Sequence, residues 1–176
     1  MKKSYFSTSL RRICGYVLNN LGIPSGAKSI TNPHIPRFIM EHKTISVIKS
    51  AILGFFDDEA YVSKKVLEVG VAVRVNDAPI THIHKIFGVK HSIGVKRLLH
   101  YFPEINIPKS NIISDLSDLL RRLGIKHKVS PTHFNINKGL LSVTWKIIIY
   151  GETNLRRVAE LGLFSLSSKL RNFPHT

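Results

Sequence analysis

The chain has 176 residues, of which 43% are hydrophobic, so it is long enough for one domain with a core, with or without an arm. No apolar run reaches the roughly 18 residues that a membrane-spanning helix needs, and the basic N-terminus lacks the apolar stretch of a secretory signal. Its single cysteine, Cys14, excludes an internal disulfide and a cysteine-based zinc site. We therefore expect an intracellular protein, cytoplasmic or organellar, that is not secreted.

Charge is the strongest global signal. The chain carries 26 Lys and Arg residues against 11 Asp and Glu residues, a formal net charge of +15. Such an excess favours a polyanionic partner, nucleic acid before an anionic membrane, although a solvated basic surface is the simpler alternative. The basic residues are spread along the chain rather than clustered in one helix, which suits a broad surface laid along a duplex.

Residues 1–43 are expected to form an N-terminal helix and a connecting arm. Residues 9–21 place apolar side chains at helical spacing, and Gly22 follows them as a stop signal. Residues 23–43 contain three prolines and one glycine, which indicates a loop with short turns.

The main domain is expected to span residues 44–176 and to begin with a helix over residues 44–58, with Thr44 as its N-cap. Residues 60–76 are strand-like, because valines alternate with other residues there. Residues 77–109 are rich in His, Lys and Gly and show no clear period.

The second part of the domain again runs from helix to strands. Residues 111–123 predict a helix, and a strand pair follows, with apolar side chains alternating over residues 141–149. A helix is expected over residues 154–161, and the basic segment Ser165–Asn172 comes after it. This order predicts an α+β fold with one antiparallel sheet and helices packed on one face. The other face, if basic, could lie in a DNA major groove.

Three consecutive acids, Asp57, Asp58 and Glu59, stand at the C-terminal end of the first helix of the domain. The helix dipole makes that end unfavourable for negative charge. A site for a hard cation such as Mg²⁺ would explain the acids, because Mg²⁺ prefers carboxylate and phosphate oxygens. On this pattern alone, a solvated helix end is an equal alternative. Ala51 and Gly54, three residues apart, would let a second helix backbone approach closely.

Ile52–Ala60 resembles the nine-residue LAGLIDADG motif of homing endonucleases, with Gly54 as the central glycine, Asp57 as the first acid and Glu59 as the second. Three later segments also resemble that family in the right order: Asp115–Ile125, Trp145–Leu155 and Gly162–Leu170. The resemblance covers roughly residues 44–172. Upstream, Leu18–Phe38 resembles what precedes the second motif in members that have two motifs.

The resemblance implies a LAGLIDADG homing-endonuclease-like fold and a site-specific endonuclease that hydrolyses phosphodiester bonds of double-stranded DNA. Each motif helix would present one carboxylate to a divalent cation such as Mg²⁺ near the scissile phosphates. Glu59 and Asp57 are the candidate metal ligands and catalytic acids. Glu59 would be the carboxylate presented at the interface, and Asp57 would more often support the helix end. Lys169 in the closing segment, or alternatively Lys146, would stabilise phosphate charge or polarise water.

One motif per chain implies a partner, because motif helices of two halves pack against each other in this family. Ala51 and Gly54 would lie in that helix interface. We therefore expect a homodimer, with two-fold symmetry and a roughly palindromic DNA site, or a complex with a separate complementary half.

A second hypothesis is a DNA- or RNA-binding protein of the same fold that does not cut, either maturase-like or regulatory. The acids Asp57 and Glu59 favour the nuclease. Ala60 in place of the motif's last glycine, the irregular residues 77–109 and the missing second motif favour the second hypothesis.

Other candidate residues are weaker. His82 and His84 would share one face of a strand and could bind a metal, but their spacing matches no zinc site, so ordinary polar or phosphate-contacting histidines are the simpler interpretation. Trp145 belongs to the apolar alternation and is expected in the core.

Overall fold

The computed structural model describes residues 27–63, 65–88 and 92–164. The helix predicted over residues 9–21, the basic segment Ser165–Asn172 and Lys169 within it lie outside the described residues. None of the helices in the described part is both long and apolar enough to cross a membrane.

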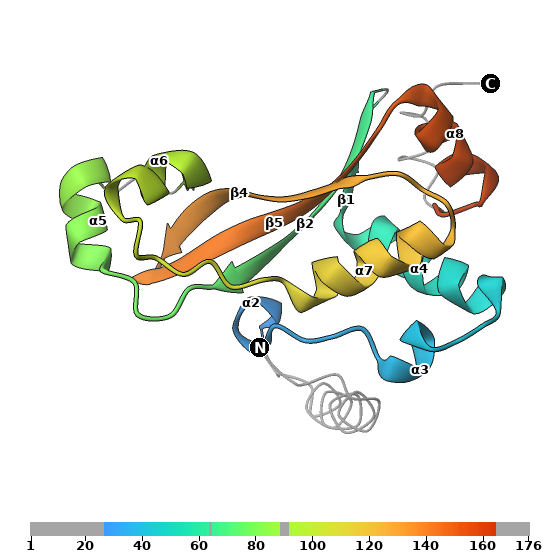
Figure 1. Cartoon of the computed structure of the whole chain (residues 1–176), viewed down its shortest axis with the longest axis horizontal. Coiled ribbons are helices and arrows are strands. Elements are labelled where there is room, and N and C mark those ends of the chain that lie inside the picture. The colour runs from blue at the N-terminus through green and yellow to red at the C-terminus, as the bar shows by residue number, and fades with distance from the viewer. Residues whose placement is uncertain (1–26, 64, 89–91, 165–176) are drawn as a thin grey trace, which may run out of the picture.

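A five-stranded sheet forms the centre of the described part, and every neighbouring pair of strands is antiparallel (Figure 1). Its spatial order is β1-β2-β5-β4-β3. The strands are β1 (Ala60–Val62), β2 (Val66–Arg74), β3 (Ser92–Gly94), β4 (Lys128–Asn137) and β5 (Leu140–Tyr150). Two hairpins, β1-β2 and β4-β5, join along the β2-β5 contact, and β3 adds an edge strand beside β4.

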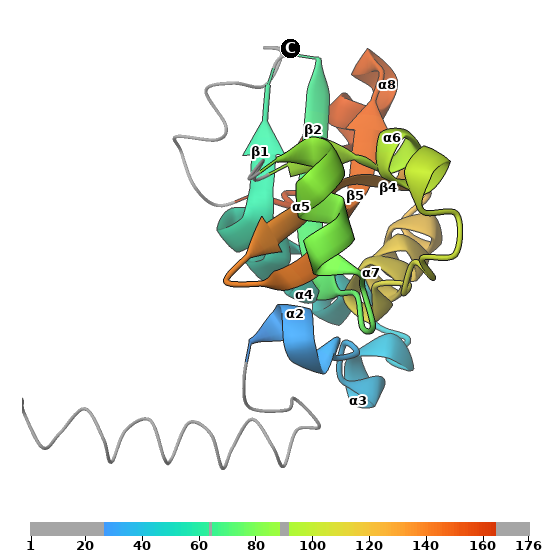
Figure 2. The same cartoon turned by 90° about the vertical axis from the view of Figure 1, so that its left-hand side faces the viewer.

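Seven helices accompany the sheet in the described residues (Figures 1 and 2). They are α2 (Lys28–Thr31), α3 (Arg37–Met40), α4 (Ile45–Glu59), α5 (Ile80–Phe87), α6 (Val95–Tyr101), α7 (Asn111–Arg122) and α8 (Glu152–Glu160). Together with the antiparallel sheet, they confirm the predicted α+β class.

One face of the sheet is buried under helices because its strands alternate apolar and polar side chains. In β2, every second residue from Leu67 to Val73 is buried, and β5 shows the same alternation. A first core cluster joins this face to buried side chains of α4, α7 and α8, such as Ile52, Leu116 and Leu155.

The far end of the same face carries a second core cluster. Here Val73 and Phe134 of the sheet pack with Ile83 of α5 and Leu98 of α6. Trp145 of β5 contacts both clusters, and its indole Nε1 donates a hydrogen bond to the carbonyl oxygen of Pro108 at 2.8 Å. Trp145 packs against the core as predicted, although it is only partly buried. Its indole N–H would lack a hydrogen-bond partner without the carbonyl oxygen of Pro108.

Several predicted elements agree closely with the structure. The helices predicted over 44–58, 111–123 and 154–161 correspond to α4, α7 and α8 within two residues. Thr44 is the N-cap residue of α4, as predicted, although its side chain makes no capping hydrogen bond. Ser110 does cap α7, accepting a hydrogen bond from the backbone N–H of Ile113 at 3.4 Å.

The irregular residues 77–109 contain two helices and one strand, α5, β3 and α6. The strand interpretation of His82 and His84 is wrong, because both lie on helix α5. Residues two apart on a helix point to different sides, so these histidines do not share a face. His82 is exposed and His84 is half-buried.

The described part of the arm is attached to the main domain. The Asn32 side chain donates to the carbonyl oxygen of Lys109 at 2.8 Å and accepts from the backbone N–H of Asn111 at 3.0 Å. The guanidinium of Arg122, at the end of α7, donates to the carbonyl oxygens of Met40 and His42. These bonds hold α2 and α3 close to α4 and α7.

Candidate functional site

Helix α4 delivers the acidic segment to the sheet. Its buried residues Ile48, Ile52 and Phe56 recur every fourth position, so one side of the helix packs into the first core cluster. The helix ends at Glu59, and β1 begins at the next residue. Ala60 has φ −80° and ψ 136°, an extended conformation that any residue adopts. The alanine at this position therefore causes no backbone strain.

Glu59 forms an ion pair that the sequence did not indicate. Its Oε1 lies 2.6 Å from the Nζ atom of Lys28 on α2, with side-chain exposures of 34% for Glu59 and 50% for Lys28. The same ammonium group lies 5.5 Å from the ring centroid of Phe55. The carboxylate is thus accessible, and a lysine that precedes it by 31 residues holds one of its oxygens.

The three acids do not converge on one point. Asp57 and Glu59 are two residues apart on α4, so they lie on different sides of the helix. Asp57 is half-buried and Asp58 is exposed. Within the described residues, no three His, Cys, Asp or Glu side chains come close enough together to hold a metal ion. Of the three, Glu59 is the one that directly precedes β1, the edge strand of the sheet.

The second face of the sheet, which we call the open face, is polar. None of its residues belongs to either core cluster. It carries Lys128, Lys146 and Arg74 against a single acid, Glu68. Following the strand register from β1 to β3, its members are Tyr61; Val66, Glu68, Gly70, Ala72 and Arg74; Leu140, Ser142, Thr144, Lys146, Ile148 and Tyr150; Lys128, Ser130, His133, Asn135 and Asn137; Ser92 and Gly94.

The strand register shows which residues of β2 and β5 lie closest in level to the end of α4. Ala60 pairs with Val69, so Glu59 precedes β1 at the level of Gly70, which pairs with Lys146. Gly70 has no side chain to stand between the two, and a β-carbon there would make only ordinary contacts with Thr144 and Lys146. Lys146 in turn forms an ion pair with Glu68 at 2.6 Å. The Glu59 carboxylate thus stands at the end of α4, directly before the edge strand β1, while the Lys146 ammonium group is held on β5, two strands from β1.

His133 lies on the open face beside Lys146. Burial, followed by the positive charge of Lys146, lowers the pKa of His133 from its ordinary value. The imidazole is therefore held in its neutral form, as a hydrogen-bonding group rather than a cation. It lies one row from Lys146, because it pairs with Thr144.

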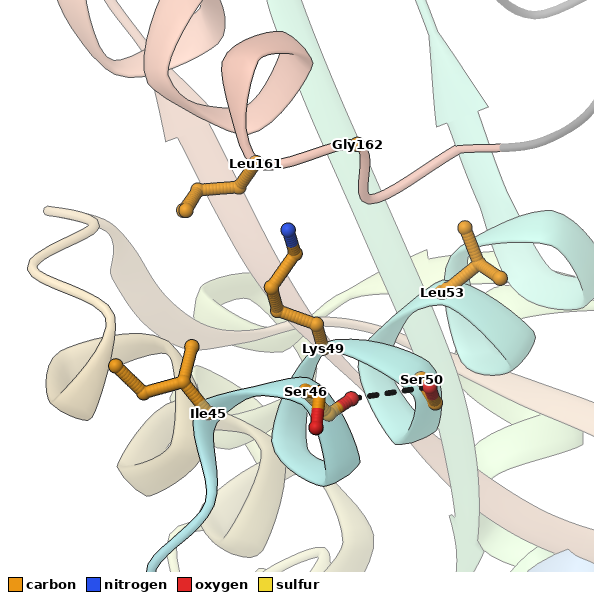
Figure 3. A pocket seen from close by; sticks show the side chains of 7 residues that line it. All are labelled: Ile45, Ser46, Lys49, Ser50, Leu53, Leu161 and Gly162. Atoms are coloured by element: carbon orange, nitrogen blue, oxygen red, sulfur yellow. Dashed lines mark hydrogen bonds between the residues drawn. The ribbon is translucent and has the colours of Figure 1, made fainter.

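The outward side of α4 is free of close neighbours at Gly54. This residue is exposed, and among the residues that the structure describes a β-carbon added there would meet nothing within 4 Å. Beside it, a groove of about 520 Å³ runs between α4 and the turn after α8 (Figure 3). Lys49 reaches into this groove toward Leu161, and Ile45 at one end is 59% exposed. Ala51, the other predicted interface residue, is half-buried.

Of the predicted site residues, Glu59 ends α4, Asp57 lies on another side of that helix, Lys146 lies on β5 and Lys169 is outside the described residues. Sequence reasoning missed Lys28 and Glu68 as partners, because no local pattern links residues 31 and 78 positions apart. Neither the family models nor the curated proteins with which the chain was compared gave a match.

Proposed function

We propose that the protein binds double-stranded DNA across the open face of its sheet and hydrolyses phosphodiester bonds with a divalent cation. The observation that carries this proposal is the position of Glu59, an accessible carboxylate where a helix end meets a polar sheet face with basic side chains. The antiparallel sheet with helices on one face is compatible with the LAGLIDADG-like fold expected from the sequence.

The composition of the open face supports a nucleic-acid surface. Asn, Ser and Thr side chains, which can hydrogen-bond to base edges, alternate there with basic residues that can contact phosphates. A two-stranded ribbon fits the major groove of B-form DNA, and the β4-β5 hairpin presents Lys128, Asn135 and Asn137 on this face. A net charge of +15 would add attraction that does not depend on base sequence.

Glu59 fits the requirements of a divalent-cation ligand. Its oxygens are the hard donors that Mg²⁺ prefers, and its side chain is only partly covered. A bound cation would supply Lewis acidity and a more acidic water at the scissile phosphate. Lys28 balances the carboxylate charge, and Lys146 on β5 offers a positive charge for a phosphate oxygen on the open face.

A second motif helix would complete the site. Gly54 lies exposed within α4, where glycine costs about 1 kcal/mol relative to alanine. Packing among the described residues does not explain that cost, whereas a helix that approaches closely would. We propose a second copy of the chain, or a complementary half, as the partner that supplies the second carboxylate.

The alternative is a DNA- or RNA-binding protein of the same architecture that does not cut. The ion pair between Glu59 and Lys28 favours it, because a carboxylate held by an ammonium group is less available to a metal ion. The open face would then serve for binding alone.

The deciding experiment incubates the protein with a randomised duplex library and Mg²⁺, and sequences the ends that are produced. Glu59→Gln removes the carboxylate charge with little change in shape, and we expect it to lower cleavage at least about a hundredfold, an effect typical of losing a key electrostatic group. Duplex affinity should change little.

Asp58→Asn is the matched control, because Asp58 is an exposed acid next to Glu59. It should cut like the wild type. Cuts that persist in Glu59→Gln would contradict the assignment of the site. An absence of cuts together with salt-sensitive duplex binding would favour the non-cleaving alternative.

A further inference from the structure

The part of the molecule farthest from α8 is a small unit that we call the basic module. It consists of α5, β3 and α6, described over residues 80–88 and 92–101. The module occupies one end of the long axis in Figure 1 and faces the viewer in Figure 2. It is anchored by Ile83, Leu98 and their neighbours in the second core cluster, and by the pairing of β3 with β4.

Acidic residues are absent from this stretch of sequence. Between Asp77 and Glu104 there is no Asp or Glu, whereas Lys85, Lys96 and Arg97 are all exposed. The same stretch contains four of the nine histidines of the chain. This stretch is therefore one of the parts of the sequence in which no acid offsets the basic residues; residues 1–40 and 119–151 also contain no Asp or Glu.

The ion pairs of the described residues leave out the cations of the module, as they leave out exposed lysines elsewhere, such as Lys43, Lys126 and Lys128. Six Lys or Arg side chains lie within 4.0 Å of a carboxylate, and none of the six belongs to the module. Arg97 packs its guanidinium 5.4 Å from the ring centroid of Phe87 instead. An aromatic ring orients a guanidinium without neutralising its charge. The module thus presents cations that are positioned but not compensated.

The module also continues the open face. Ser92 and Gly94 of β3 pair with Asn135 and His133 of β4, so β3 adds one more strand to the edge of that face. Helix α6 begins directly after Gly94. Strand β3 therefore brings the module to the edge of the open face, while α5 and α6 pack on the opposite face of the sheet.

We propose that the basic module binds the sugar–phosphate backbone of duplex DNA outside the segment that lies on the open face. This inference rests on the proposed binding of duplex DNA by the sheet and extends its footprint. Lys85, Lys96 and Arg97 contact phosphates, so the module contributes affinity that is independent of base sequence.

The test compares two variants of the full chain that lose three positive charges each. Lys85→Gln/Lys96→Gln/Arg97→Gln removes the exposed cations of the module. Arg121→Gln/Arg156→Gln/Arg157→Gln removes three arginines from α7 and α8, each paired with an acid. All six positions are exposed on helices, and equal thermal unfolding midpoints would verify that both variants fold.

The measurement is the dissociation constant for a random-sequence duplex of about 30 base pairs as a function of salt. Each phosphate contact contributes roughly 0.9 to the slope of log K against log salt. The module variant is expected to lose about two to three from that slope and to bind at least tenfold more weakly. The control variant should keep the wild-type slope. With a duplex of about 10 base pairs, enough for the sheet alone at roughly 3.4 Å per pair, the difference between the variants should shrink.

Equal losses in the two variants would mean that only net charge matters and would overturn the assignment to the module. An unchanged slope in the module variant, with the wild type binding normally, would overturn this inference and leave the proposed function intact. Failure of the wild type to bind duplex would defeat both.

Discussion

The two ends of the proposed DNA-binding surface use their charges in different ways. Near the end of α4, cations are paired with acids: Lys28 with Glu59, and Lys146 with Glu68. In the basic module, Lys85, Lys96 and Arg97 have no acid in the surrounding stretch of sequence. A carboxylate that pairs with a cation holds the cation in place but cancels much of its electrostatic potential. An unpaired cation keeps its electrostatic potential and has no fixed partner.

The contrast suggests a division of labour. Chemistry at a phosphate needs groups held in one geometry, because a small displacement of a reacting group is costly. Affinity for a duplex needs net positive charge, which acts over about a Debye length and tolerates motion. The region around Glu59 suits the first requirement and the basic module suits the second.

The largest effect expected from a single further change concerns the exposed side of α4. Gly54→Ala should raise the free energy of unfolding of the monomer by about 0.5–1 kcal/mol, because alanine favours a helix and its β-carbon meets no atom within 4 Å. If α4 packs closely against a second motif helix, the same methyl group should weaken self-association. Urea unfolding and analytical ultracentrifugation measure the two effects separately.

Ser50→Ala is the control on the same helix. Ser50 is exposed and its hydroxyl donates only to the carbonyl oxygen of Ser46 at 3.0 Å. It should alter both quantities little. If Gly54→Ala gives stabilisation with unchanged association, the helix interface proposed for Gly54 is contradicted.

Strongly periodic elements could be predicted from the sequence because their signal is local. The valine alternation of β2 and the leucine spacing of α7 each reflect one buried face. The module could not be predicted this way, because α5, β3 and α6 are at most eight residues long and cover fewer than three turns or a single short edge. Short segments of this kind gain their structure from the second core cluster, which no local pattern shows.

The residues of the candidate site also fall into two groups, those that local sequence spacing reveals and those that only the fold brings near. Glu59 could be located because the acids and the glycine lie within one helix, so their spacing is visible in the sequence. Lys28 and Gly70 reach the same place from α2 and β2, and only the fold joins them. Lys146 could be named as a candidate, but its pairing with Glu68 depends on strand register and could not be predicted.

Lys28→Met tests whether the paired charge at Glu59 matters to a cation. The ion pair is half-exposed, so it should be worth about 0.2–1 kcal/mol. If Mg²⁺ must compete with the ammonium group for the Glu59 carboxylate, the concentration that gives half-maximal cleavage should fall about two- to fivefold. Lys126→Met removes the same charge from an exposed position in the turn before β4 and is the control.

A higher Mg²⁺ requirement in Lys28→Met, with Lys126→Met unchanged, would contradict competition. Lys28 would then help to hold the carboxylate in place for the metal ion, and the ion pair would cease to be an argument for the non-cleaving alternative.

The smallest expected effect arises between the two regions, at His133. Its pKa is lowered in the folded protein by burial and by Lys146, so the unfolded chain takes up the proton first as the pH falls. The unfolded state therefore binds more protons in the window that begins near the ordinary histidine pKa of about 6.5 and ends at the lower folded pKa. Stability should fall as the pH drops through that window and level off below it.

His133→Gln should remove this part of the pH dependence, whereas His82→Gln, at an exposed position on α5, serves as the control in urea unfolding at several pH values. A bound duplex should oppose the effect, because phosphates near Lys146 would offset the charge that disfavours the imidazolium. Saturating DNA is therefore expected to flatten the profile of the wild type and to leave that of His133→Gln unchanged. A wild-type profile that DNA does not alter would argue that the backbone lies away from the centre of the open face, and that phosphate contacts are confined to the basic module.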